Sequence, residues 1–182
     1  LAPAMAFRMN FVGELGWELH HPIEYQNHIF DAIMSAGAEF GIKPFGIRAM
    51  DAMRLEKSYR LVGTELSIEY AALESGLHRF VHLNKGEFKG RQKLSQWQES
   101  GFANTLVTLE VHDTTDADAI GGNPIMLPDG EVIGRATGGG YGFRLDKSLA
   151  LAMVRPELAA VGTELMIDVL DQRLRATVLE ES

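Results

Sequence analysis

Apolar residues alternate with polar ones in the N-terminal part of the chain. Between positions 5 and 20 they fall on odd positions, at Phe7, Met9, Phe11, Trp17 and Leu19. This spacing is typical of a strand. Gly13 and Gly16 interrupt the segment and favour a bulge or a tight turn in its middle.

The spacing then changes to that of helices. From Tyr25 to Phe40, apolar residues recur at helical intervals with polar residues between them, which predicts an amphipathic helix. Gly41-Ile-Lys-Pro44 ends it. A second helix is predicted from Phe45 to Tyr59, where good helix formers surround the apolar positions. A short third helix is predicted to start after Gly90 and to end near Ser100-Gly101.

A change of composition near positions 99–104 marks the second half of the chain. Before it, the end of the segment 72–83 is expected to be strand-like. After it, short alternating segments are separated by glycine-rich or acidic turns, which predicts strands. They include 107–111, a hairpin at Pro128-Asp-Gly130, a buried strand at 149–154 and a closing hairpin around Asp171-Gln172.

The predicted fold class is therefore α+β. Residues 1–100 are expected to form an α+β domain, and residues 101–182 an all-β, barrel-like domain. The 182 residues, 46% hydrophobic and 23% charged, have an ordinary globular composition. No apolar run approaches the roughly 20 residues of a membrane helix, and no signal peptide is recognised. The chain starts with Leu1 instead of Met, which fits a fragment, and we expect a cytoplasmic location (the mitochondrial matrix in a eukaryote).

Charge and residue usage exclude several kinds of chemistry. The absence of Cys excludes disulfides and thiolate metal sites and fits a reducing compartment. The net charge of −8 argues against a nucleic-acid partner. His78 and His82 have no third ligand nearby, so no metal site is expected. The glycines at 138–140 lack the Lys-Ser/Thr of a phosphate loop and are expected to be permissive backbone at a packed turn.

Two carboxylates, Glu14 and Glu18, lie four residues apart in the first alternating segment. A carboxylate accepts two parallel donors at once, and the edge of a pterin presents such a pair, a ring N–H beside an exocyclic amino group. The alternative is that Glu18 pairs with Arg8 or lies in water, and spacing alone favours this alternative. On the second predicted helix, Asp51 and Arg54 are spaced for an ion pair, and Arg54 is expected to brace the fold.

Two segments carry a family resemblance, Asn10-Phe-Val-Gly-Glu-Leu-Gly-Trp-Glu-Leu-His20 and Gly46-Ile-Arg-Ala-Met-Asp-Ala-Met-Arg-Leu-Glu-Lys57. In this order they resemble the folate-binding family of the glycine cleavage T-protein (aminomethyltransferase). The chain resembles even more closely the C-terminal, tetrahydrofolate-binding half of dimethylglycine and sarcosine dehydrogenases. The segment from Gly134 to Val154 is similar to the family's C-terminal barrel signature. Because the match begins in the middle of the family's pattern, the chain looks like the back half of a larger enzyme.

The resemblance implies a fold and a set of site residues. The fold would be the second half of a folate-binding, ferredoxin-like α/β domain followed by a C-terminal antiparallel β-barrel. Glu18 would grip the pterin and Phe11 would pack on it, although Phe11 replaces a frequent Tyr and cannot donate a hydrogen bond. Met50 replaces an Arg that the glycine cleavage branch usually has near the folate. The family's catalytic aspartate would lie upstream, so no catalytic residue is expected in this chain.

The implied function is one-carbon transfer. An upstream flavin (FAD) domain, for which this chain has no dinucleotide fingerprint, would oxidise an N-methyl amine of the dimethylglycine or sarcosine type. Tetrahydrofolate held by this chain would accept the one-carbon unit to give 5,10-methylenetetrahydrofolate. The expected partners are folate, the small amine, and the upstream half of the same enzyme or a partner subunit, with neither nucleic acid nor a membrane.

Three other functions stay open. One is the aminomethyltransferase of the glycine cleavage system, which Met50 disfavours. Another is a non-catalytic folate-binding relative used in folate sensing or iron–sulfur assembly, which the absence of Cys disfavours. The last is a purely structural β-module. Quenching of the fluorescence of Trp17, next to Glu18, by a folate would separate this last function from the others.

Overall fold

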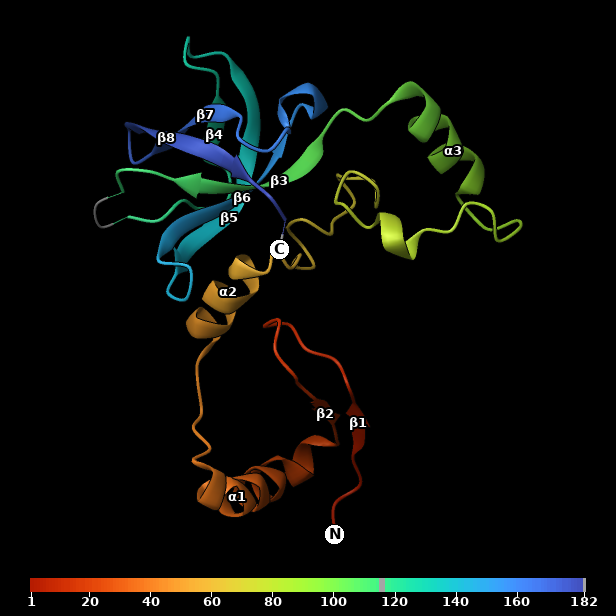
Figure 1. Ribbon diagram of the computed structural model, residues 1–182. Helices are drawn as coiled ribbons and strands as arrows, with labels where there is room; N and C mark the ends of the chain where they lie inside the picture. The colour runs from red at the N-terminus through yellow and green to blue at the C-terminus, as the bar shows by residue number, and fades with distance from the viewer. Residues whose placement is uncertain (115–116, 182) are drawn as a thin grey trace. The chain divides into compact units, whose positions relative to one another are not determined.

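The computed structural model describes residues 1–114 and 117–181 (Figure 1). Contacts within the chain divide it into two compact units, Leu1–Arg54 and Leu55–Ser182. The division falls inside a helix, so this helix contributes residues to both units. This division differs from the domain boundary that we predict between residues 100 and 101, and that boundary remains a prediction.

The first unit begins with a two-stranded antiparallel ribbon. β1 (Met5–Phe7) pairs with β2 (Glu18–His20), so that Phe7 lies opposite Glu18 and Met5 opposite His20. Residues 8–17 connect the two strands as a loop. The predicted strand spacing is therefore realised only at the two ends of the segment, and the glycines in its middle lie in the predicted turn.

Helices follow the ribbon. A short 3-10 turn, η1 (Ile23–Tyr25), leads into α1 (Gln26–Gly37), and a second one, η2 (Ala38–Phe40), follows it. Gly41 then ends the helical stretch with a left-handed φ of 70°, as glycines at helix C-termini commonly do. α2 (Ile47–Glu56) is the second helix. Both predicted helices are confirmed, with shorter bounds than the apolar spacing indicated.

The stretch before the barrel consists mainly of turns. η3 (His78–Phe80) lies where the end of segment 72–83 was expected to be strand-like, and that prediction is wrong. The backbone bonds locally there, and the Phe80 N–H donates to the Leu77 carbonyl at 3.0 Å. A closed sheet offers this segment no free edge to pair with. α3 (Arg91–Ser100) confirms the third predicted helix.

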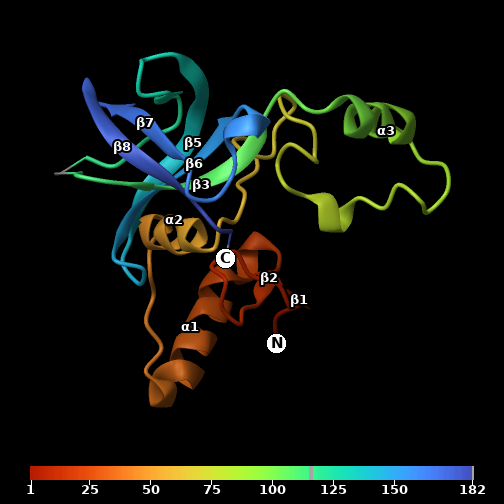
Figure 2. The same cartoon turned by 45° about the horizontal axis from the view of Figure 1, so that its top comes forward.

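Six strands of the second unit form a closed barrel in the order β3-β6-β5-β4-β7-β8 (Figures 1 and 2). Every neighbouring pair is antiparallel. A 3-10 turn, η4 (Pro156–Leu158), follows the barrel strand that ends at Val154. The strands are β3 (Thr105–Val111), β4 (Pro124–Met126), β5 (Val132–Gly142), β6 (Lys147–Val154), β7 (Glu164–Val169) and β8 (Gln172–Leu179). The predicted α+β class with a C-terminal antiparallel barrel is confirmed.

The two predicted hairpins are present. Pro128-Asp-Gly130 lies in the turn between β4 and β5, where the Gly130 N–H donates to the Leu127 carbonyl at 2.9 Å. The closing hairpin turns at Leu170 and Asp171, both with positive φ, one residue earlier than predicted. Two successive residues with positive φ suit the twist of a two-residue hairpin.

The glycine run at 138–140 lies inside β5, where a turn was expected. A bulge between Ala136 and Gly138 shifts the register against β6. A Cβ on Gly139 would lie 2.6 Å from the Ala119 carbonyl oxygen and 2.9 Å from that of Leu149. The expectation of close packing against another element is therefore confirmed, but the position is a strand.

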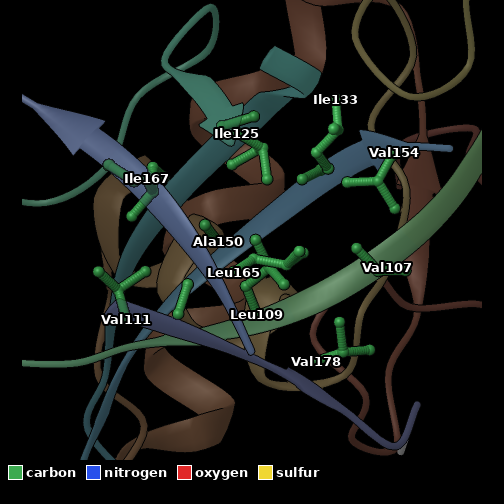
Figure 3. Packing of buried hydrophobic residues seen from close by; sticks show 14 of the residues in the cluster. Val107, Leu109, Val111, Ile125, Ile133, Ala150, Val154, Leu165, Ile167 and Val178 are labelled. Carbon is green, nitrogen blue, oxygen red and sulfur yellow. The ribbon is translucent and has the colours of Figure 1, made fainter. Parts of the chain in front are cut away.

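The barrel interior is the core of the second unit, and Figure 3 shows its branched side chains pointing toward one another. β6 is buried from Ser148 to Val154, as its continuous apolar run predicted. The reason is that its two faces are covered differently. Ala150, Ala152 and Val154 face the barrel core, whereas Leu149 and Leu151 pack with Leu55 outside it. Among the residues described, no helix has the length and apolar character to cross a membrane.

Candidate functional site

The loop between β1 and β2 carries Phe11 and leads directly into Glu18. The Asn10 side chain accepts a hydrogen bond from the Gly13 N–H at 2.8 Å, which holds the first turn of the loop. A Cβ on Gly16 would lie only 2.7 Å from the Cβ of Asn10. Glycine is therefore required where the loop passes its own beginning, and these contacts fix the path of the backbone from Phe11 to Glu18.

Glu18 stands on β2 with about half of its side chain exposed. Its Oε2 lies 3.4 Å from Nε2 of His20, two residues along the same strand. Two alternatives were considered from the sequence, pairing with Arg8 or exposure to water. The described residues do not show the pairing with Arg8, whereas the Glu18 side chain is partly exposed to water. A partly exposed carboxylate retains oxygen lone pairs that face solvent, and these can accept a donor pair from a ligand.

Phe11 lies beside a cation. The guanidinium carbon of Arg54 is 6.0 Å from the centre of the Phe11 ring, within the range of a cation–π contact. Arg54 Nε also donates to Asp51 Oδ1 at 2.5 Å, so the predicted ion pair along α2 is present. The bracing role expected for Arg54 thus includes support of Phe11, which sequence spacing did not reveal.

A separate hollow lies on the outside of the barrel. Two adjoining cavities of about 450 and 210 Å³ share Tyr70, Gly122 and Arg135 in their walls. Arg135 donates to the Tyr70 hydroxyl at 2.9 Å and to Glu69. The hydrogen bonds that Arg135 donates, first that to Tyr70 and then that to Glu69, raise the pKa of Arg135 above its usual value. Because Glu69 balances the charge of Arg135, the described residues that line this hollow include no free cation for an anionic ligand.

The other residues considered from the sequence do not form a site. Across residues 1–114 and 117–181, no three His, Asp or Glu side chains come together as metal ligands. His78 begins η3 and His82 lies just after it, and neither is part of such a group among the described residues. The candidate site of this chain is therefore the segment Phe11–His20 of the first unit.

Comparison with known families matches two models to this chain. The GCVT N-terminal domain matches residues 1–85, and the glycine cleavage T-protein C-terminal barrel domain matches residues 104–182. The second match covers the whole closed barrel, from the start of β3 to the end of β8, which confirms the barrel part of the resemblance.

Two kinds of relatives are similar to this chain in sequence. Human mitochondrial dimethylglycine dehydrogenase is 41% identical over 180 residues, which is 98% of this chain and 21% of the relative. The aminomethyltransferase of Moorella thermoacetica is 35% identical over 177 residues, which is 95% of this chain and 46% of the relative. The chain thus spans about a fifth of the first relative and just under half of the second.

A solved structure has the same fold. The glycine cleavage system aminomethyltransferase T from Bartonella henselae superposes with a TM-score of 0.86 at 22% sequence identity. The superposition covers 96% of this chain and 48% of that one.

Proposed function

Because this chain belongs to the glycine cleavage T-protein (aminomethyltransferase) family, we propose that it is the tetrahydrofolate-binding part of a one-carbon-transfer enzyme. The donor would be an N-methyl amine of the dimethylglycine or sarcosine type, and the product would be 5,10-methylenetetrahydrofolate. The observation that carries this proposal is the 41% identity to human dimethylglycine dehydrogenase across 98% of the chain. In a eukaryote the compartment would be the mitochondrial matrix, and in a bacterium the cytoplasm.

Glu18 and Phe11 are the proposed ligand contacts. The Glu18 carboxylate would accept the two parallel donors of the pterin edge, and Phe11, supported by Arg54, would pack on the ring face. Tetrahydrofolate, when bound, supplies the nitrogen nucleophiles that accept the one-carbon unit. The contribution of this chain is positioning, since holding a nucleophile beside a small electrophile in fixed geometry accounts for a large part of such a rate enhancement.

We further propose that the upstream half of the same enzyme, or a partner subunit, covers the first unit. No residue of β1, β2 or α1 is buried in the described chain, and the apolar face of α1 includes exposed Phe30 and Ile33. A two-stranded ribbon has marginal stability by itself. The catalytic carboxylate and the flavin site would both belong to this upstream part.

The Glu18→Gln substitution tests the pterin contact. We expect 5-formyltetrahydrofolate to bind the variant about 10-fold more weakly, because one charge-assisted hydrogen bond is worth roughly 1.4 kcal/mol or more. Isothermal titration calorimetry of the chain and the variant measures this difference. The Glu14→Gln substitution removes the same charge from the loop that precedes β2, and as the matched control it should change the affinity less than about 2-fold.

Two outcomes would contradict the proposed function. Equal affinity of the Glu18→Gln variant and the unchanged chain would remove Glu18 from the site. The second outcome is that the ligand binds neither the chain nor a fusion of the chain to the upstream part of human dimethylglycine dehydrogenase. That outcome would exclude folate binding altogether.

The aminomethyltransferase of glycine cleavage is the second candidate. It is favoured by the 35% identity to the Moorella thermoacetica aminomethyltransferase over 95% of this chain. The natural full-length protein that contains this chain separates the two candidates, because only a methylamine-oxidising enzyme produces 5,10-methylenetetrahydrofolate from dimethylglycine or sarcosine. Product formation from those amines supports the first candidate, and product formation only from a glycine-derived donor supports the second.

A further inference from the structure

We propose that His20 is a positioning residue that orients the Glu18 carboxylate for the edge of the pterin. The inference rests on the proposed function of Glu18 and adds a second residue to that site. His20 would not need to touch the ligand. It acts by fixing the plane and the rotamer of the carboxylate that does.

The strand places the two side chains on one face. Residues two apart in a β-strand point to the same side, so Glu18 and His20 of β2 face the same way. Nε2 of His20 lies 3.4 Å from Oε2 of Glu18. The neighbouring His21 makes a different contact, because its Nδ1 bonds the Pro22 carbonyl at 2.9 Å. Of these two histidines, only His20 contacts the carboxylate.

The opposite strand holds the His20 ring in place. Phe7 of β1 lies directly across from Glu18, which puts it diagonally across from His20. The Phe7 and His20 ring centres are 5.0 Å apart, and the rings meet edge to face at 84°. This arrangement is favourable for aromatic rings. It fixes the direction in which Nε2 points, toward Glu18.

The hydrogen bond to His20 leaves room for the ligand. An ionised carboxylate has about four lone-pair positions, and the pterin edge needs one on each oxygen. A histidine N–H uses a third, on Oε2. A glutamate side chain that is already held also loses less rotamer freedom when the ligand binds. His20 therefore prepares Glu18 for the ligand without competing for the same lone pairs.

Three variants separate this role from a structural one. In the His20→Phe variant, the ring that packs on Phe7 is kept and the N–H donor is lost, and 5-formyltetrahydrofolate should bind about 3- to 10-fold more weakly. The donor is kept in the His20→Gln variant, which should bind within about 2-fold of the unchanged chain. The His21→Phe variant is the matched control and should also bind unchanged. Calorimetric titration measures all three.

The same substitution in the Glu18→Gln background completes the test. If His20 acts through the Glu18 carboxylate, the His20→Phe change should have less than about 2-fold further effect in that background. Unchanged affinity of the single His20→Phe variant, or an equal loss in both backgrounds, would overturn the positioning role. An unchanged affinity of the Glu18→Gln variant itself would instead overturn the proposed function.

Discussion

The Gly134→Ala substitution is expected to prevent the barrel from closing properly. Gly134 of β5 pairs with Val154 of β6 and with Ile125 of β4, so strands flank it on both sides. A Cβ at this position would lie 2.2 Å from the Met153 carbonyl oxygen and 2.9 Å from the Val154 Cα. Both are backbone atoms, which cannot move away without breaking the ladder of hydrogen bonds. We expect the free energy of unfolding to fall by about 3 kcal/mol or more.

Urea unfolding followed by circular dichroism measures this loss. The Gly46→Ala substitution is the matched control, because no atom lies within 4 Å of a Cβ built there. It should change the free energy of unfolding by less than about 0.5 kcal/mol. If the Gly134→Ala variant unfolds at the same urea concentration as the unchanged chain, β5 and β6 do not approach each other as closely as described at Gly134.

The Glu65→Ala substitution is expected to cost about 3–5 kcal/mol of unfolding free energy. Glu65 has no exposed surface, and its carboxylate accepts hydrogen bonds from the Leu61 N–H at 2.8 Å, from the Thr64 hydroxyl at 2.7 Å and from the Thr137 hydroxyl. The last bond fastens the segment around Leu61 to β5. The Leu61 N–H would be left without an acceptor, which costs about 1–3 kcal/mol, whereas the Thr64 and Thr137 hydroxyls can still donate to the Leu61 and Leu151 carbonyl groups. The cavity that the removed side chain leaves adds about 2 kcal/mol.

The same unfolding measurement tests this prediction. Glu131 supplies the control, because it pairs with Arg155 at 2.5 Å while about half of its side chain is exposed. Removal of an exposed ion pair costs at most about 1 kcal/mol. A Glu65→Ala variant no less stable than the Glu131→Ala variant would show that the buried carboxylate does not hold this segment on the barrel.

The sequence predicted those elements whose residue pattern does not depend on which other elements pack against them. The amphipathic pattern at 25–40 predicted α1, because one face of a helix repeats at fixed intervals whatever covers it. Turn residues predicted the hairpin at Pro128-Asp-Gly130, because turn chemistry is local. The apolar run at 149–154 predicted a strand buried on both faces, and the structure shows what covers each face.

The errors occur where pairing partners decide the outcome. The apolar residues near Leu83 resemble a strand, but a strand needs a free sheet edge, and the barrel is closed. The glycines at 138–140 resemble a turn, but they let β5 run close to the Ala119 and Leu149 carbonyl groups. Neither arrangement can be read from local spacing, because both depend on residues far away in the sequence.

The candidate site shows the same limit. Glu18 and Phe11 emerged from the family resemblance, whereas spacing alone favoured an ordinary surface carboxylate. The contacts of Arg54 with Phe11 and of His20 with Glu18 depend on the path of the loop and on the strand register. One sequence signal pointed to the second contact, since Glu18 and His20 are two residues apart in a segment with strand spacing.

A crystal structure of the chain with 5-formyltetrahydrofolate would show whether Glu18 binds the edge of the pterin. We expect the ring nitrogen and the exocyclic amino nitrogen each to lie within about 2.7–3.2 Å of a Glu18 carboxylate oxygen. We also expect the Phe11 ring to lie against the pterin face. A pterin bound elsewhere, with Glu18 directed into solvent, would show that Glu18 is not the pterin contact.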